Sequence, residues 1–404
     1  MSHLQSLLSK LHTLATGLDL SAGDRPDTHA GDNPETMPAE DTPEIAVARN
    51  LEVSKLQYLL LALTKMCPLI QSQPGNAMTR FLFSATLQKI GHEHDELQDV
   101  LLPTREFYDN SICREVEKAH LTLSQAHDIC DKLCAESIKS VEVLRQLKMN
   151  PRPHSDVYIT PTTHGHSQVC WGSESLLISD LHLNALRTAY NTTTDPTQKH
   201  FNQRLFCLLM RYKTVGGPMY QCSVTPQTFA VLKNQFKVTK ECMASPFNHN
   251  ADTYWSAFRD TDGPFGSQGS FFASLESPLV TQGGSFYANP PFTEELLHLL
   301  THHIQEILKF SVPVSFICLF PTWPDVESYK YMKNSPFCKE CVVLEPHKHA
   351  YIDGSQQVNT ETTKKHHVSQ FRTTLFIVQN EMGSARWPVN DHKMRALLES
   401  FADM

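Results

Sequence analysis

The stretch GSFYANPPF at residues 284–292 separates a predicted strand from a predicted helix in this chain of 404 residues. Its first five residues are mostly apolar and predict a short buried strand. The residues after it predict a helix, because Leu296, Leu300, Ile304 and Ile307 recur at helical spacing on one face. Two consecutive prolines restrict the backbone between these elements and favour a rigid turn. The stretch therefore predicts α/β packing at this point of the chain.

The residues on both sides continue an alternation of strands and helices. Residues 314–320 read VSFICLF, a nearly continuous apolar run that is typical of a strand buried on both faces. We predict strands near 237–243, 284–288, 314–320, 340–344 and 371–378, and helices near 225–235, 293–309 and 325–333. This order indicates the α/β fold class, with a mostly parallel sheet covered on both faces by helices.

The first half of the chain has a different pattern. Residues 50–148 show helical periodicity and almost no glycine, whereas residues 151–180 contain short β-like runs between prolines. Two more helices are predicted near 182–190 and 197–213. We therefore divide the chain into a short helix with a disordered acidic linker (1–49), a helical domain (50–150), a mixed connecting region packing on the core (151–215), the α/β domain (216–390) and a C-terminal helix or tail (391–404).

Composition and charge narrow the class of protein. The net charge is −8, and residues 21–44 carry seven carboxylates against one arginine, a local charge of about −6. The remainder is close to neutral, which argues against a surface coated with basic groups. The 11 cysteines are scattered, no leader peptide is recognisable and no apolar run is long enough to cross a bilayer. We expect a soluble intracellular protein with reduced thiols and no membrane contact.

The turn at Asn289-Pro290-Pro291-Phe292 suits chemistry on a planar amino group. An exocyclic aromatic amine is a poor nucleophile because its lone pair is delocalised into the ring. The side-chain oxygen of Asn289 and the backbone carbonyl of Pro290 are two acceptors for its N–H groups, and Phe292 offers a flat stacking face. Methyltransferases that act on amino nitrogens use this arrangement, so all four residues are predicted to be catalytic. The alternative is a turn in which the asparagine only caps the helix.

The methyl donor, S-adenosylmethionine, is expected at the end of the preceding strand, where open α/β sheets bind ligands. This segment reads ECMASPFN at 241–248 and contains no glycine-rich fingerprint, although its small residues permit close approach. Asp260 or Asp262 is suited to accept hydrogen bonds from the cofactor, or is simply a turn residue. The candidate cofactor-binding residues are Glu241, Ala244, Ser245, Pro246, Asn248, Asp260, Asp262 and Phe265.

One cluster has the residue types of a metal site. Cys338 and Cys341 form a Cys-x-x-Cys pair, and His347 and His349 follow. The spacing does not fit the usual zinc-finger pattern, so we predict no metal site.

Four blocks in order resemble one known family. They are ECMASPFN (241–248), SAFRDTDG (256–263), FGS (265–267) and GSFYANPPF (284–292). In this order they are similar to the phosphorylated-CTD-interacting-factor family of cap-specific adenosine N6-methyltransferases, and weaker similarity spans about 150–390. The resemblance implies a Rossmann-like class I methyltransferase sheet joined to an N-terminal helical domain. It implies methylation of the first transcribed adenosine, usually 2′-O-methylated, beside a 7-methylguanosine cap at the 5′ end of mRNA.

Recognition of the cap triphosphate would need cationic side chains. The candidates for this RNA-binding role are Arg204, Arg211, Lys213, Lys364, Lys365 and Arg372.

One departure from the family concerns recruitment. A WW module needs two tryptophans close in sequence, whereas those of this chain, Trp171, Trp255, Trp323 and Trp387, are widely separated. We therefore expect no WW-mediated binding to the polymerase tail, and a nuclear location by family analogy with the cytoplasm as the alternative. Two other functions remain open: a DNA or internal-RNA adenine methyltransferase, and a non-catalytic scaffold that binds capped RNA.

Overall fold

The computed structural model describes residues 41–87, 99–103, 109–151, 156–163, 165–193, 200–216, 221–354 and 366–402. Three predictions lie outside these residues: the amphipathic helix at 2–19, the acidic linker up to residue 40, and the RNA-binding role of Lys364 and Lys365.

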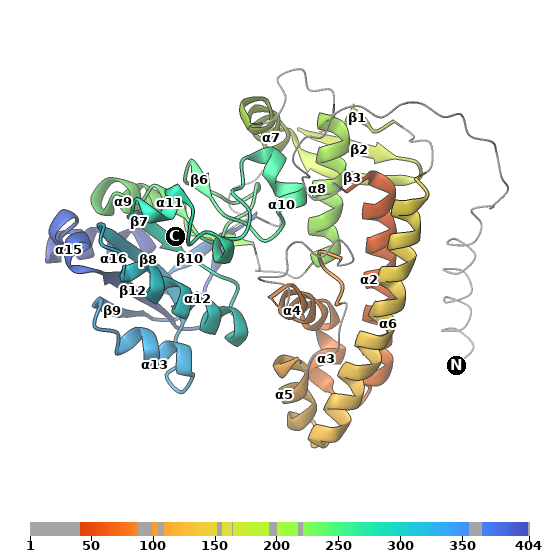
Figure 1. Cartoon of the computed structure of the whole chain (residues 1–404), viewed down its shortest axis with the longest axis horizontal. Coiled ribbons are helices and arrows are strands. Elements are labelled where there is room, and N and C mark those ends of the chain that lie inside the picture. The colour runs from red at the N-terminus through yellow and green to blue at the C-terminus, as the bar shows by residue number, and fades with distance from the viewer. Residues whose placement is uncertain are drawn as a thin grey trace. The chain divides into compact units, whose positions relative to one another are not determined.

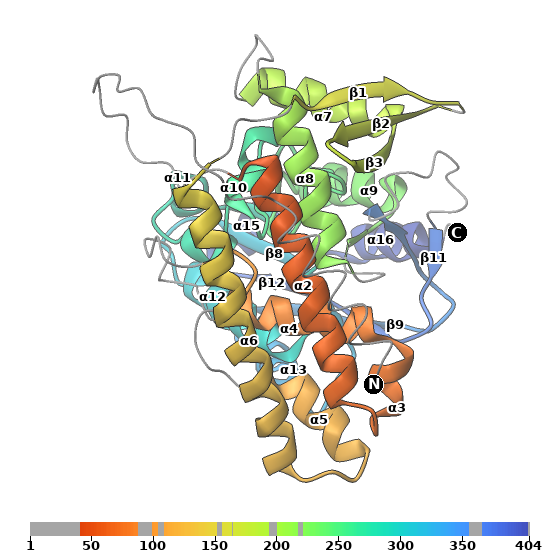
Figure 2. The ribbon, with the colours of Figure 1, turned by 90° about the vertical axis from the view of Figure 1, so that its right-hand side faces the viewer.

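The predicted helical region forms five described helices. These are α2 (Pro43–Leu63), α3 (Pro68–Ser72), α4 (Pro74–Leu87), α5 (Asn110–Lys118) and α6 (Leu123–Met149). The long helices α2 and α6 run side by side (Figures 1 and 2). Leu56 and Leu60 of α2 share one hydrophobic core with Ile129 and Leu133 of α6, which confirms the helical pattern of this region. Thr122 and Gln125 form a capping box that fixes the start of α6.

The predicted linker ends earlier than the sequence indicates. Helix α2 begins at Pro43, so residues 43–49 are helical, whereas their composition predicts a linker. Thr42 caps this helix, and Asp41 forms an ion pair with Arg49 two turns later. The acidic, proline-rich composition before residue 43 gives no sign that a helix begins there. The helix start is stabilised by the pairing of Asp41 with Arg49, which forms only once the helix has folded.

A small antiparallel sheet and two helices connect the two halves. The strands are β1 (Tyr158–Pro161), β2 (His166–Trp171) and β3 (Glu174–Ser179), and the helices are α7 (Asp180–Thr193) and α8 (Phe201–Val215). All of these elements were predicted near their observed positions. Helix α8 packs against both α2 and β2, so it joins the helical region to this sheet.

The central sheet has six strands in the order β6-β5-β7-β8-β12-β9. They are β5 (Lys240–Glu241), β6 (Thr253–Tyr254), β7 (Gly284–Ala288), β8 (Val314–Pro321), β9 (Cys338–Leu344) and β12 (Thr373–Gln379). The first four are parallel, and β12 runs antiparallel to both β8 and β9. The predicted mostly parallel, Rossmann-like sheet is therefore confirmed, with β12 as its one reversed strand.

Helices cover both faces of this sheet. They are α9 (Pro226–Phe236), α11 (Pro278–Thr281), α12 (Glu294–Leu308), α13 (Glu327–Lys333), α15 (Glu381–Arg386) and α16 (Asp391–Ala402), with the 3₁₀ turn η2 (Phe271–Ala273). The short α10 (Arg259–Asp262) and the 3₁₀ turn η1 (Gly263–Phe265) instead contact α8 and α7. Phe286 and Phe316 share a core with α12, whereas the neighbouring Tyr287 and Ile317 share one with α9 and α16. This alternation explains why the strands are apolar throughout.

A third sheet, in the order β11-β10-β4, contributes β4 (Cys222–Ser223), β10 (Ala350–Asp353) and β11 (His366–Val368). Residues Cys222 and Asp353 are paired in its register.

The strand order creates a switch point between β5 and β7. From β5 the chain continues to β6 on one side and later returns to β7 on the other. The carboxyl ends of β5 and β7 therefore border a crevice, below which the two strands are directly paired: the Cys242 amide donates to the Tyr287 carbonyl at 2.8 Å. This arrangement brings the segment after Glu241 beside Asn289. Because β12 is reversed, its first residues lie at the same edge as the end of β8.

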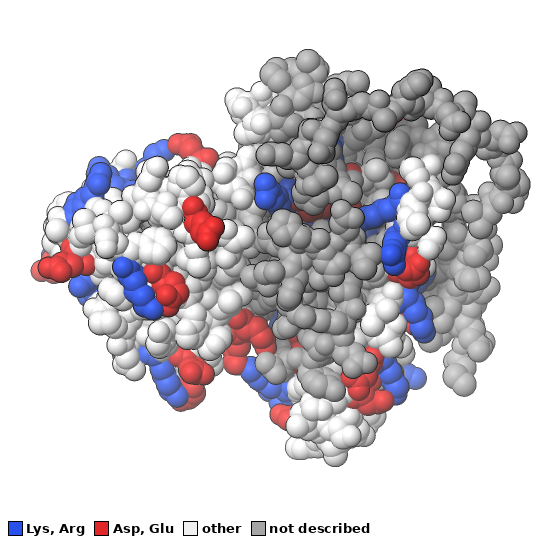
Figure 3. Space-filling view, viewed as in Figure 1, with Lys and Arg blue, Asp and Glu red and all other residues white. Residues whose placement is uncertain are grey.

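The surface of the described part has mixed charge. Figure 3 shows lysines and arginines interspersed with carboxylates on one face. None of the helices in the described ranges is both long enough and apolar enough to cross a bilayer.

Candidate active site

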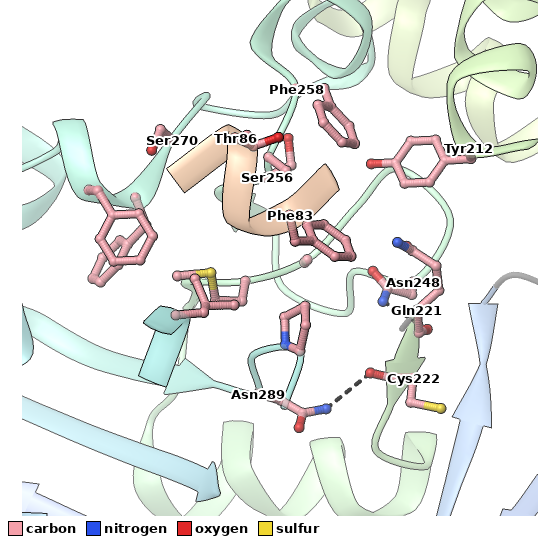
Figure 4. A pocket seen from close by; sticks show the side chains of 17 residues that line it. Phe83, Thr86, Tyr212, Gln221, Cys222, Asn248, Ser256, Phe258, Ser270 and Asn289 are labelled. Carbon is pink, nitrogen blue, oxygen red and sulfur yellow. Dashed lines mark hydrogen bonds between the residues drawn. The ribbon is translucent and has the colours of Figure 1, made fainter. Parts of the chain in front are cut away.

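Asn289 follows the last residue of β7 and has a defined orientation. Its Nδ2 donates a hydrogen bond to the backbone carbonyl of Cys222 at 3.0 Å (Figure 4). Since a carbonyl oxygen can only accept, the amide nitrogen must face Cys222. The acceptor Oδ1 is therefore turned away from this contact, ready for a donor on a ligand.

The backbone at Gln221 and Cys222, which accepts the hydrogen bond from Asn289, is itself held by several contacts. Gln221 accepts hydrogen bonds through its carbonyl from the Gly354 amide at 2.9 Å and from Asn248 Nδ2 at 3.0 Å. Cys222 belongs to β4 and is paired with Asp353 of β10. The segment at 221–222 thus links the Asn289 side chain to the loop after β5 and to the third sheet.

Two pockets meet at this asparagine. The first is lined by Met243 and Ala244 after β5, Ser256, Ala257 and Phe258 after β6, Ser270, Phe271 and Phe272 at η2, Asn289, Pro291 and Leu296, with Gln221, Cys222 and Asn248. Phe83 and Thr86 of α4 and Tyr212 of α8 complete the wall (Figure 4). None of these described lining residues is charged.

The second pocket lies on the other side of the turn. It is lined by Asn76, Cys222, Asn289, Pro290, Pro291, Phe292, Pro321, Thr322, Trp323, Tyr351, Phe371 and Arg372. The rings of Phe292 and Phe371 are 5.9 Å apart in an edge-to-face arrangement. Cys222, Asn289 and Pro291 line both pockets, so the predicted catalytic turn forms the partition between them.

Of the predicted cofactor-binding residues in the turn after β5, two line the first pocket and two do not. Ala244 and Asn248 line the first pocket. Ser245 and Pro246 are buried beneath the turn and do not line it. Asn248 Oδ1 accepts hydrogen bonds from the Ser245 amide at 2.7 Å and from its hydroxyl at 3.0 Å. The serine therefore shapes the turn that presents the other two residues.

Glu241 is 3% exposed and does not line the first pocket. Its carboxylate accepts hydrogen bonds from the backbone amides of Asn250 at 2.6 Å and Ala251 at 3.0 Å. Burial raises the pKa of this carboxyl to about 7. Its contacts fix the loop between β5 and β6.

Asp260 is held by a buried ion-pair network. Arg211 donates to Asp260 Oδ1 at 3.0 Å and to Asp41 Oδ2 at 2.7 Å, and Arg49 binds Asp41 and Asp99. Arg211 is 2% exposed, so its predicted contact with RNA is wrong: both the burial and the paired carboxylates exclude it. Asp260 pairs with Arg211 and is not among the residues lining the first pocket.

Asp262 and Phe265 also lie outside the lining of the first pocket. Asp262 is fully buried and accepts a hydrogen bond from the Tyr212 hydroxyl at 2.8 Å. Burial raises its pKa to about 7. Because Tyr212 lines the pocket, Asp262 influences it through this hydroxyl. Phe265 packs against Tyr190 and Phe201 in a separate core.

The remaining cationic candidates differ in position. Arg372 is exposed, lines the second pocket and donates to Glu345 at 2.9 Å. Arg204 is half-buried, and burial lowers its pKa. Lys213 is exposed and lies 3.5 Å from the carboxylate of Glu174. Neither Arg204 nor Lys213 lines either pocket.

The Cys-x-x-Cys segment lies on strand β9, away from both pockets. His349 uses one ring nitrogen with the Glu345 carbonyl and the other with the Thr373 hydroxyl, both at 3.0 Å. Within the described ranges, no three or more metal-ligating side chains form a group suited to a metal ion.

Several lining residues were not identified from the sequence. Cys222 acts through its backbone, so its side-chain type carries no signal. Asn76 and Phe83 belong to a helix about 200 residues before Asn289, as their numbers show, and only packing brings them to the site. Trp323 and Phe371 had a usable signal, because Trp323 comes three residues after one predicted strand and Phe371 begins another, both at the ligand-binding edge.

Comparisons with known proteins find a family model and relatives that are similar to this chain. The family model described as "Phosphorylated CTD interacting factor 1 WW domain" matches residues 182–354, which run from α7 to β10. Because this description names a WW domain, the expected lack of WW-mediated polymerase binding stays a prediction.

Two curated relatives carry the name mRNA (2′-O-methyladenosine-N(6)-)-methyltransferase. The mouse protein is 29% identical over 306 residues, which is 71% of this chain and 42% of the relative. The human protein is 34% identical over 223 residues, which is 52% of this chain and 30% of the relative. The chain thus spans less than half the length of either relative. Over residues 182–354, this chain is similar to the phosphorylated CTD interacting factor 1 family.

Proposed function

We propose that this protein is an S-adenosylmethionine-dependent methyltransferase that methylates the N6 amino group of adenosine in RNA. The proposed target is the first transcribed adenosine beside the 7-methylguanosine cap of mRNA. The observation that carries this proposal is the orientation of Asn289, whose Oδ1 faces away from Cys222 at the partition between two pockets.

The first pocket suits the cofactor. S-adenosylmethionine supplies a methyl group that is already activated for transfer. Phe83, Phe258 and Phe271 offer aromatic faces, which attract a sulfonium cation as well as an adenine ring. Ser256 and Asn248 offer polar groups for the ribose and the amino-acid part. Gln221 Oε1 is buried and has no hydrogen-bond partner among the described residues, so an acceptor at this pocket awaits a donor.

The second pocket suits the target base. Phe292, Phe371 and Trp323 provide aromatic surface for stacking, and Arg372 provides a cation for a nearby phosphate. Asn289 Oδ1 and the Pro290 carbonyl accept the two amino N–H groups. These contacts hold the nitrogen in line with the first pocket and increase its electron density. Catalysis is then mainly alignment and electrostatics, without a strong base.

The named activity of the mouse and human relatives supports the choice of mRNA and of the N6 position. We extend the proposal to a nuclear location, where newly capped transcripts are found.

A panel of matched substrates tests the proposal. The protein is incubated with methyl-labelled cofactor and capped RNA starting with 2′-O-methyladenosine, its uncapped counterpart, a capped RNA starting with guanosine, and a single-stranded DNA. We expect label only in the first RNA, recovered as N6-methylated adenosine after digestion. Equal labelling of uncapped RNA would remove the cap from the proposal, and labelling of DNA would favour a broader adenine methyltransferase. Absence of both labelling and cofactor binding by calorimetry would favour a non-catalytic scaffold.

A further inference from the structure

We propose that Asn76 of α4 positions the RNA in the second pocket by accepting a hydrogen bond from a ribose 2′-hydroxyl. This inference rests on the proposed function and adds a residue from the helical region to the substrate site.

One buried atom of the Asn76 side chain has no partner among the described residues. Its Nδ2 donates to Gln73 Oε1 at 2.8 Å, which fixes the orientation of the amide group. Its Oδ1 is buried and makes no hydrogen bond to any of the described residues. Buried acceptors are usually satisfied, because an unpaired one loses its hydration without replacement. This oxygen lies in a residue that lines the pocket together with Asn289 and Phe292.

Helix α4 contributes side chains to both pockets of the site. Helix α4 packs against α12, which begins directly after the catalytic turn. Asn76, Arg80 and Phe83 are spaced four and three residues apart, so they share one face of α4. Asn76 lines the second pocket and Phe83 lines the first. Between them, the buried Nε of Arg80 also lacks a partner within the described residues. An acceptor followed by a cation along one face suits the sugar and phosphate of a nucleic acid.

The chemistry of the nucleotide selects the donor. Adenosine within an RNA chain carries two kinds of hydrogen-bond donor, the amino N–H groups and the 2′-hydroxyl. The acceptors at Asn289 and Pro290 account for both amino hydrogens. On the target nucleotide the 2′-hydroxyl remains. Where that oxygen is methylated, we assign the contact to the 2′-hydroxyl of the next nucleotide, and deoxy substitution there separates it from donors of the bases and of the cap. The same contact would distinguish RNA from DNA.

A combination of protein and substrate changes tests this contact. Asn76→Ala is compared with wild type on capped RNAs that carry a hydroxyl or a hydrogen at the 2′ position of the first or the second nucleotide. We expect the variant to raise KM for the hydroxyl RNA roughly three- to tenfold, as for the loss of one hydrogen bond, with kcat and cofactor Kd unchanged. The deoxy substitution at the contacted position should raise the wild-type KM by a similar factor and add nothing in the variant. Alanine is the stronger helix former, so folding of α4 is retained.

The control is the exposed Asn334→Ala, which lines neither pocket and should leave KM close to that of wild type. An unchanged KM in Asn76→Ala would overturn the proposal. If Asn76→Ala still had a higher KM than wild type on RNAs that lack the 2′-hydroxyl at either position, the 2′-hydroxyl would be refuted as the donor. RNA binding measured by fluorescence anisotropy gives the same comparison without turnover. Failure of the wild type to methylate any RNA would refute the proposed function and leave the binding comparison to judge Asn76.

Discussion

The carboxyl ends of β5 and β7 lie side by side, but their sequences are informative to very different degrees. After β7 the chain has Asn289 and two prolines, a combination that suggests a specific role. After β5 it has Met243 and Ala244, which are common in any core. Both ends line the first pocket. The difference follows from the tasks that we propose for them: directing two acceptors at an amino group requires specific atoms, whereas admitting a cofactor requires only space and a suitable surface.

The turns after β7 and β5 also differ in how far along the chain their stabilising contacts reach. The prolines restrict the turn after β7 locally, but the direction of the Asn289 amide depends on the Cys222 carbonyl, 67 residues earlier. The turn after β5 is shaped by contacts within a few residues, from Ser245 and Asn248. The more recognisable motif is therefore the one that depends more on distant structure.

The largest expected effect comes from the end of β7. Asn289→Ala removes the Oδ1 acceptor and should lower kcat by about 10²–10³-fold, the usual cost of losing one preorganised electrostatic contact. Cofactor binding, measured by calorimetry, should change little because the first pocket keeps its other walls. The exposed Asn334→Ala is a matched control. Turnover close to wild type in Asn289→Ala would remove the distinction between the two strand ends.

A smaller effect is expected at the end of β5. Ala244→Val adds two methyl groups to the lining of the first pocket and should weaken cofactor binding roughly tenfold, because overpacking typically costs about 1–3 kcal/mol. The KM for RNA should stay unchanged. Ala385→Val on the exposed face of α15 serves as the control. If the substitution at 244 affected RNA rather than cofactor, the roles given to the two pockets would be reversed.

The smallest effect concerns pH. Burial raises the pKa of Asp262 from 3.8 to about 7 and that of Glu241 from 4.5 to about 7. The folded state therefore binds more protons than the unfolded state between about pH 4 and 7, so the free energy of unfolding falls as pH rises through this range. Asp262→Asn, which stays neutral, should reduce the fall in melting temperature between pH 5 and 8. Exposed Asp252→Asn controls for the loss of one carboxylate. An identical pH profile in Asp262→Asn would show that this side of the site does not titrate as inferred.

Charged residues show where reasoning from the sequence succeeded and where it did not. Asp41 was assigned to a disordered linker and Arg211 to RNA, yet the two form a buried ion pair. Neither residue type carries a local signal for burial, because a buried charge is defined by its partners. Arg372 looked similar in the sequence and does line the second pocket, since it directly precedes β12 at the ligand-binding edge.

By itself, the sequence determined the alternation of strands and helices, the parallel character of the sheet and the turn at Asn289–Phe292, to which we assign a catalytic role. These features depend on periodicity and on the backbone restriction of proline, both of which are local. Only the tertiary structure decided which way the Asn289 amide faces, which carboxylates are occupied by Arg211, and that Asn76 and Phe83 reach the site from α4. These features depend on contacts between segments far apart in the chain, and no local pattern specifies them.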